Sequence, residues 1–107
     1  MSDFMIMNQN MVQGQILPEN VVNPRLIDAF LRVPREKFVP RQLARIAYMD
    51  TEFPLQNGRC LLRPATLARL LQALDPQPLE NILYIAGGTG YGPALLSHMS
   101  AHIIALD

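Results

Sequence analysis

The strongest constraint on the fold lies near the carboxyl end, where an apolar run at 82–86 stops in a glycine-rich turn at 87–92. An apolar pattern at helical spacing follows, and then a second apolar run at 102–106. Buried parallel strands read as continuous apolar runs, and a glycine turn between strand and helix lets a ligand approach the main chain. We therefore predict a strand at 82–86, a helix over about 91–99 and a strand at 102–106, joined as a right-handed βαβ unit.

This order of elements also predicts a nucleoside-type cofactor site. In nucleotide-binding sheets an acid about 20 residues beyond the glycine turn accepts hydrogen bonds from ribose hydroxyls, and Asp107 stands at that distance. The dinucleotide fingerprint is incomplete, because Pro93 takes its third glycine position after Gly88 and Gly90. A phosphate-binding loop is excluded, since no lysine follows the glycines. Many α/β strands end in glycine, so the turn alone leaves a purely structural role open as well.

Composition limits the remaining functions. The chain has 107 residues, enough for one domain, and is 50% hydrophobic and 17% charged, so it should fold. Its nine basic and nine acidic residues cancel, which argues against nucleic-acid and membrane-surface partners. There is no signal peptide and no apolar run near the roughly 20 residues that cross a bilayer, so we expect a cytoplasmic protein. One cysteine and no metal-ligand cluster predict neither an internal disulfide nor a bound metal.

The front of the chain reads as helical. One or two helical turns followed by a loop are expected up to residue 22, because Pro18 interrupts the pattern. Asn23–Pro24 predicts a helix start, Pro34 ends that helix, and further helices are expected at about 41–47 and from Pro64 to about residue 74. Residues 48–64 show no lasting period and predict a long loop. We thus expect a helical region at 1–80, containing this loop, and a βαβ unit at 81–107.

Several segments from about residue 11 to the last residue match one known family in its order and spacing. They are MVQGQI at 11–16, NPR at 23–25, VPREKFVP at 33–40, AYMD at 47–50, FPL at 53–55 and GRCLLRP at 58–64. These segments resemble protein-L-isoaspartate O-methyltransferases, which use S-adenosylmethionine and have their substrate loop at the position of the last segment. The glycine turn resembles the looser pattern of methyltransferases with this cofactor.

The resemblance implies a fold and an activity. The expected fold is α/β: N-terminal helices followed by the first βαβ unit of a Rossmann-like S-adenosylmethionine methyltransferase parallel sheet, which is incomplete here. The implied activity is protein repair by methyl transfer to the carboxylate of isoaspartyl residues in a protein or peptide. The implied cofactor-binding residues are Ala86, Gly87, Gly88, Gly90 and Asp107, and the implied substrate-loop residues are Arg59, Cys60, Leu62 and Arg63.

The chain departs from the family at the chemistry. The loop threonine and serine of the family correspond to Cys60 and Leu62, and leucine cannot replace the hydroxyl that the family associates with catalysis. We therefore assign no catalytic residue and expect little or no activity on isoaspartyl peptides. Arg59 and Arg63 would suit another anionic substrate, whereas Cys60 and Leu62 could equally pack under the loop. Tyr84 replaces the acid that the family usually has in the strand.

A non-catalytic interaction module that keeps the fold is the alternative function. The family's sheet normally continues beyond the position of Asp107, and two parallel strands cannot cover both of their edges. We expect these 107 residues to be the front half of a larger domain. In isolation they should self-associate through the exposed edges, as a homo-oligomer, or be poorly stable.

Overall fold

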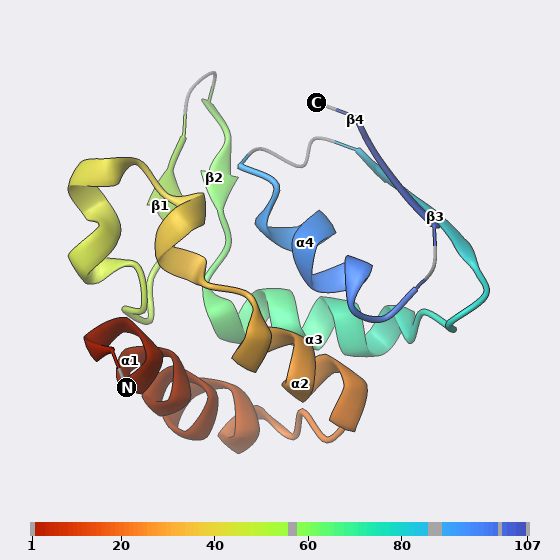
Figure 1. Ribbon diagram of the computed structural model, residues 1–107, viewed down its shortest axis with the longest axis horizontal. Coiled ribbons are helices and arrows are strands. Elements are labelled where there is room, and N and C mark those ends of the chain that lie inside the picture. The colour runs from red at the N-terminus through yellow and green to blue at the C-terminus, as the bar shows by residue number, and fades with distance from the viewer. Residues whose placement is uncertain (1, 56–57, 86–88, 101, 107) are drawn as a thin grey trace.

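Helices form the first half of the chain, and a small parallel sheet forms the last part (Figure 1). The computed structural model describes residues 2–55, 58–85, 89–100 and 102–106. The first half of the chain contains, in order, α1 (Asp3–Met11), the π-helical turn η1 (Val12–Ile16), the 3₁₀ turn η2 (Leu17–Glu19), α2 (Pro24–Arg32) and the 3₁₀ turns η3 (Arg35–Phe38) and η4 (Arg41–Ile46). The second half contains β1 (Phe53–Pro54), β2 (Cys60–Leu61), α3 (Pro64–Leu74), β3 (Asn81–Ile85), α4 (Tyr91–Ser97) and β4 (His102–Leu106).

The amino-terminal helix is longer than predicted. Instead of one or two turns and a loop, α1 continues through η1 into η2. Ser2 Oγ caps its start by accepting a hydrogen bond from the Met5 amide at 3.2 Å, and the apolar side chains of Met11 and Ile16 are buried. Burial thus extends the helix past the point where local propensity would end it, and Pro18 is accommodated in the first turn of η2, where no amide donor is needed.

The helices α2 and α3 confirm the predictions made from their caps. The Asn23 side chain accepts hydrogen bonds from the amides of Arg25 at 3.0 Å and Leu26 at 3.4 Å, as an N-cap should. Helix α2 ends before Pro34, and α3 begins at Pro64. The segment predicted as a helix at 41–47 forms the 3₁₀ turn η4.

The predicted βαβ unit is confirmed. Strands β3 and β4 pair in parallel, with Asn81 opposite His102 and Ile85 opposite Leu106. Helix α4 connects them and covers one face of the sheet (Figure 1). The other face carries exposed apolar side chains, with Leu83 56% and Ile104 61% exposed.

One hydrophobic core joins the front helices to the βαβ unit. Arg25 in α2 donates from Nη2 to the Pro76 carbonyl at 2.9 Å and from Nη1 to the Met99 carbonyl at 3.1 Å. These carbonyls lie in the segments that precede β3 and β4 in the sequence. The rings of Phe30 and Tyr91 meet edge to face, 6.3 Å apart. The core therefore runs across residue 80, and the domain boundary placed there stays a prediction. None of the helices in the described part of the chain is long and apolar enough to span a membrane.

Candidate functional site

The long loop at 48–64 contains a short antiparallel hairpin that the sequence did not reveal. Strands β1 and β2 pair Phe53 with Leu61 and Pro54 with Cys60, and the Leu55 amide donates to the Arg59 carbonyl at 2.7 Å. Two-residue strands are too short to show an alternating pattern. The hairpin extends on the side of the molecule where β3 and β4 end (Figure 1). Ligands of open α/β sheets bind at the carboxyl ends of the strands, so this hairpin borders the expected ligand region.

The structure describes the glycine-rich segment from Thr89 onward. Thr89 and Gly90, which directly precede α4, are half-buried. Gly90 has φ of +89°, a left-handed conformation that side chains disfavour. A β-carbon added to Gly90 would lie 3.9 Å from Cε1 of Phe38, so the Phe38 ring borders the turn without filling it. The other predicted cofactor-binding residues, Ala86, Gly87, Gly88 and Asp107, lie outside the described residues.

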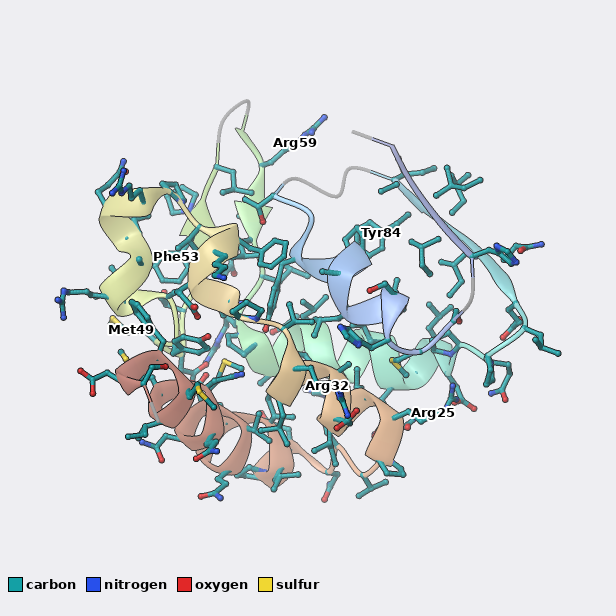
Figure 2. The ribbon with its side chains drawn as sticks, in the orientation of Figure 1. Arg25, Arg32, Met49, Phe53, Arg59 and Tyr84 are labelled. Atoms are coloured by element: carbon teal, nitrogen blue, oxygen red, sulfur yellow. The ribbon has the colours of Figure 1, made fainter. Side chains whose placement is uncertain are left out.

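Three of the four predicted substrate-loop residues are exposed or project from the hairpin. Cys60 is exposed, which contradicts the alternative that it packs under the loop, and the Glu52 carboxylate beside it raises the pKa of its thiol. Arg59 is half-buried and projects from the hairpin toward the side where the sheet ends (Figure 2). Arg63 is exposed and donates from Nε and Nη2 to Asp50 Oδ1, at 3.1 and 2.9 Å.

Leu62 is the exception among the four. Its side chain is half-buried and packs against the hydrophobic core. Its carbonyl oxygen accepts a hydrogen bond from Arg35 Nη2 at 3.1 Å. Main chain and side chain of this position are therefore both fixed by the core.

Arg35 is the residue that sequence reasoning missed. It stands in the VPREKFVP segment and is completely buried, with 0% of its surface exposed. Its Nε donates to the Ala47 carbonyl at 2.6 Å, and its guanidinium carbon lies 5.0 Å from the ring centre of Tyr91 and 5.9 Å from that of Phe53. Beyond its place in that segment, nothing in the sequence marks it as buried, because charged residues surround it in the chain.

The neighbouring Glu36 holds the beginning of the same loop. It accepts a short hydrogen bond from the Tyr48 hydroxyl, and Gln15 Nε2 donates to the Tyr48 carbonyl at 2.8 Å. Burial raises the pKa of the Tyr48 phenol, and the Glu36 carboxylate raises it further. Together with the hydrogen bond from Arg35 to the Ala47 carbonyl, these contacts fix the main chain at the beginning of the loop, at residues 47 and 48.

Comparison with known proteins identifies relatives along nearly the whole chain. The family model described as protein-L-isoaspartate(D-aspartate) O-methyltransferase (PCMT) matches residues 6–105. A protein-L-isoaspartate O-methyltransferase of Syntrophus aciditrophicus is 34% identical over 107 residues, which are 100% of this chain and 49% of that protein. The corresponding protein of Methanospirillum hungatei is 36% identical over 99 residues, 92% of this chain and 46% of its own length. The chain thus spans about half the length of these curated relatives.

Solved structures show the same fold. A Plasmodium falciparum protein described as a protein-L-isoaspartate O-methyltransferase, in complex with S-adenosyl-L-homocysteine, superposes with a TM-score of 0.73 at 19% identity, covering 100% of this chain and 50% of that one. Another structure described by the same enzyme name gives a TM-score of 0.71 at 22% identity, over 92% of this chain and 33% of its own. At these identities the likeness establishes the fold, and it confirms the predicted α/β architecture.

Proposed function

The chain belongs to the protein-L-isoaspartate O-methyltransferase family, and we propose that it supplies the substrate-loop and cofactor-turn part of an S-adenosylmethionine-dependent protein carboxyl methyltransferase. The observation that carries this proposal is the placement of the β1–β2 hairpin on the side where β3 and β4 end (Figure 1). A substrate held by the hairpin and a cofactor held by the turn between β3 and α4 would then meet at one edge of the sheet.

The proposed cofactor site is the main chain of the glycine turn. Gly90 fits this role, since its left-handed φ of +89° keeps that end of the turn without a side chain. We assign Ala86, Gly87 and Gly88 to the same site, and Asp107 to the ribose hydroxyls, as the family resemblance implies. The Plasmodium falciparum relative, which binds S-adenosyl-L-homocysteine, supports this choice of ligand.

In the proposed methyl transfer, the main task of this chain is to position the substrate carboxylate against the methyl group. S-adenosylmethionine supplies a methyl group on a sulfonium; a carboxylate oxygen forms the new bond to that methyl while the carbon–sulfur bond breaks and its electron pair stays on sulfur. A substrate carboxylate is already ionised at neutral pH, so no strong base is required. The hairpin therefore has to orient the carboxylate and exclude water. Leu62 adds no hydroxyl there, and we propose that activity on isoaspartyl peptides is weak for this reason.

The two loop arginines differ in where their side chains lie. Arg63 pairs with Asp50. Arg59 projects from the hairpin on the side where the sheet ends (Figure 2). We therefore propose Arg59 as the arginine nearer to the substrate.

Calorimetric titration with S-adenosyl-L-homocysteine tests the cofactor site. We expect Asp107→Ala to weaken binding by about ten- to a hundredfold, because one charge-assisted hydrogen bond to the ribose is worth roughly 1.5–3 kcal/mol. Asp28→Ala is the matched control, since Asp28 lies in α2 and pairs only with Arg32 in the described part of the chain. Undiminished binding by Asp107→Ala would refute its assigned role, and no binding by the unmodified protein would refute the cofactor site.

A non-catalytic, self-associating interaction module is the second candidate function. The outer face of the sheet favours it, because Leu83, Ile85 and Ile104 are 56%, 69% and 61% exposed there. In the described part of the chain, β3 and β4 have only each other as strand partners, which leaves an unpaired edge on each. A tight dimer in sedimentation experiments without methyl transfer would support this function. A stable monomer would count against it.

A further inference from the structure

The buried guanidinium of Arg35 connects two segments that the proposed function places on opposite sides of the reaction. Nη2 donates to the carbonyl of Leu62, the residue directly after β2 in the substrate-type loop. The guanidinium carbon lies 5.0 Å from the ring centre of Tyr91, the residue directly after Gly90. Arg35 therefore contacts the end of the hairpin and the first residue of α4 at the same time.

Arginine suits this connection because of its shape. A planar fork can donate to carbonyl groups in its own plane while its flat face stacks on an aromatic ring. Arg35 does both: Nε and Nη2 take the carbonyls of Ala47 and Leu62, and the rings of Tyr91 and Phe53 lie within cation–π distance. Lysine would keep the charge but could not reproduce the fork.

The environment of Arg35 also indicates a specific constraint. Burying a charged group is costly unless it is hydrogen-bonded or paired. No acidic side chain in the described part of the chain forms an ion pair with Arg35, so carbonyl oxygens and ring faces stabilise its charge. Desolvation lowers the pKa of Arg35, although guanidinium remains protonated in proteins. Methionine or leucine would fill the same space in the core without a buried charge, so the arginine at position 35 does more than fill apolar volume.

We propose that Arg35 is a positioning residue that sets the distance between the substrate-type loop and the glycine turn. It does so by donating to the Leu62 carbonyl while its guanidinium lies over the Tyr91 ring at the start of α4. The catalytic meaning of this spacing rests on the proposed function, because methyl transfer in line requires the two reactants to be aligned closely. The mechanical part, in which Arg35 orders the hairpin against α4, stands on the contacts alone.

The closing experiment uses hydrogen exchange and three variants. Arg35→Met keeps the apolar stem and removes the donors, and Arg35→Lys keeps the charge and removes the fork. Arg32→Met is the matched control, since Arg32 lies three positions earlier, is exposed and pairs with Asp28. We expect backbone amides in peptides covering 53–55, 58–63 and 89–95 to exchange about tenfold faster in Arg35→Met and by a smaller factor in Arg35→Lys, while those of α1 and α2 keep their rates.

Each outcome decides the proposal. Unchanged exchange in the hairpin would overturn it, as would equal acceleration in the hairpin, α1 and α2, because Arg35 would then stabilise the whole core. If Arg35→Met does not fold, Arg35→Lys decides by the same criterion, and unfolding of both variants overturns the proposal. In a methyl-transfer assay, Arg35→Lys should lower kcat about tenfold with KM for the methyl donor nearly unchanged. A raised KM at full kcat would overturn the positioning role, whereas absent S-adenosyl-L-homocysteine binding would reject only the proposed function.

Discussion

The phenol ring of Tyr84 occupies the space that a side chain on Gly92 would need. Tyr84 lies in β3 and points inward to α4 (Figure 2), and its Cζ is 2.6 Å from the place where a β-carbon of Gly92 would stand. Gly92 is buried in the first turn of α4. The tyrosine that replaces the family's usual strand acid is therefore accommodated by a glycine in the helix that follows.

Gly92→Ala should consequently destabilise the fold by about 1–3 kcal/mol, because overpacking against the rigid end of a ring outweighs the gain in helix propensity. Tyr84→Val in the same chain should recover most of this loss, which a double-mutant cycle in urea unfolding would measure. Gly14→Ala is the control, since a β-carbon there would meet nothing within 4 Å. Equal effects of the two glycine substitutions would contradict the matched pair.

Substitutions at two glycines with positive φ can distinguish the effect of backbone strain from the effect of ligand binding. Gly58 in the hairpin has φ of +73° and Gly90 in the glycine turn has +89°. Alanine at either position should cost about 1–2 kcal/mol of stability, because both demand a left-handed conformation. We expect only Gly90→Ala to weaken the binding of S-adenosyl-L-homocysteine in calorimetry. Loss of binding in both variants, or in neither, would argue against a cofactor on the turn.

The parts of the fold that follow from short-range signals could be predicted from the sequence. Asn23 caps α2 with its own side chain, Pro34 and Pro64 mark helix boundaries, and the alternation of apolar runs and glycines marks the βαβ unit. The length of α1 could not be predicted, because it depends on Met11 and Ile16 being buried by elements far away in the chain.

The same division applies to the candidate site. The left-handed Gly90 follows from the local glycine pattern, and its ligand stays a prediction. The position of Arg35 depends on its hydrogen bonds to the carbonyls of Ala47 and Leu62, which are 12 and 27 positions away in the chain. Arg63 donates to Asp50, 13 positions earlier, in the folded chain, and its suitability for an anionic substrate stays a prediction. Such pairings are decided by tertiary structure and leave no mark on the neighbouring sequence.

Leu62→Ser should raise methyl transfer to an isoaspartyl peptide. The family resemblance implies a serine hydroxyl at this position, and a single positioned donor contributes roughly 10²–10³-fold to acyl-transfer rates, so we expect a gain of about tenfold or more. The Leu62 carbonyl keeps its bond from Arg35, since the backbone is unchanged. Leu62→Ala removes similar apolar volume without adding a hydroxyl. If serine and alanine gave the same rate, the hydroxyl would not be the missing group.

The ion pair between Arg63 and Asp50 should contribute little to stability. Both side chains are about half exposed, with 47% and 49% of their surfaces accessible, and exposed pairs typically contribute about 0.2–1 kcal/mol. A double-mutant cycle with Arg63→Gln and Asp50→Asn in urea unfolding should give a coupling in this range. The coupling should fall in about 1 M sodium chloride because salt screens exposed charges. A coupling well above that range, insensitive to salt, would show that the pair is shielded from solvent.

Two buried phenols predict a loss of stability at alkaline pH. Burial raises the pKa of Tyr91 to about 12, with Arg35 opposing the shift, and burial with Glu36 raises that of Tyr48. The folded chain thus retains protons that the unfolded chain releases above about pH 10. The contribution of these phenols to the free energy of unfolding should therefore be constant below that pH and fall from about pH 10 to 12, by at most about 1.4 kcal/mol per pH unit for each phenol. Tyr91→Phe should remove one phenol's share of this slope. Urea unfolding followed by circular dichroism at several pH values measures both slopes, and parallel curves would show that Tyr91 titrates normally.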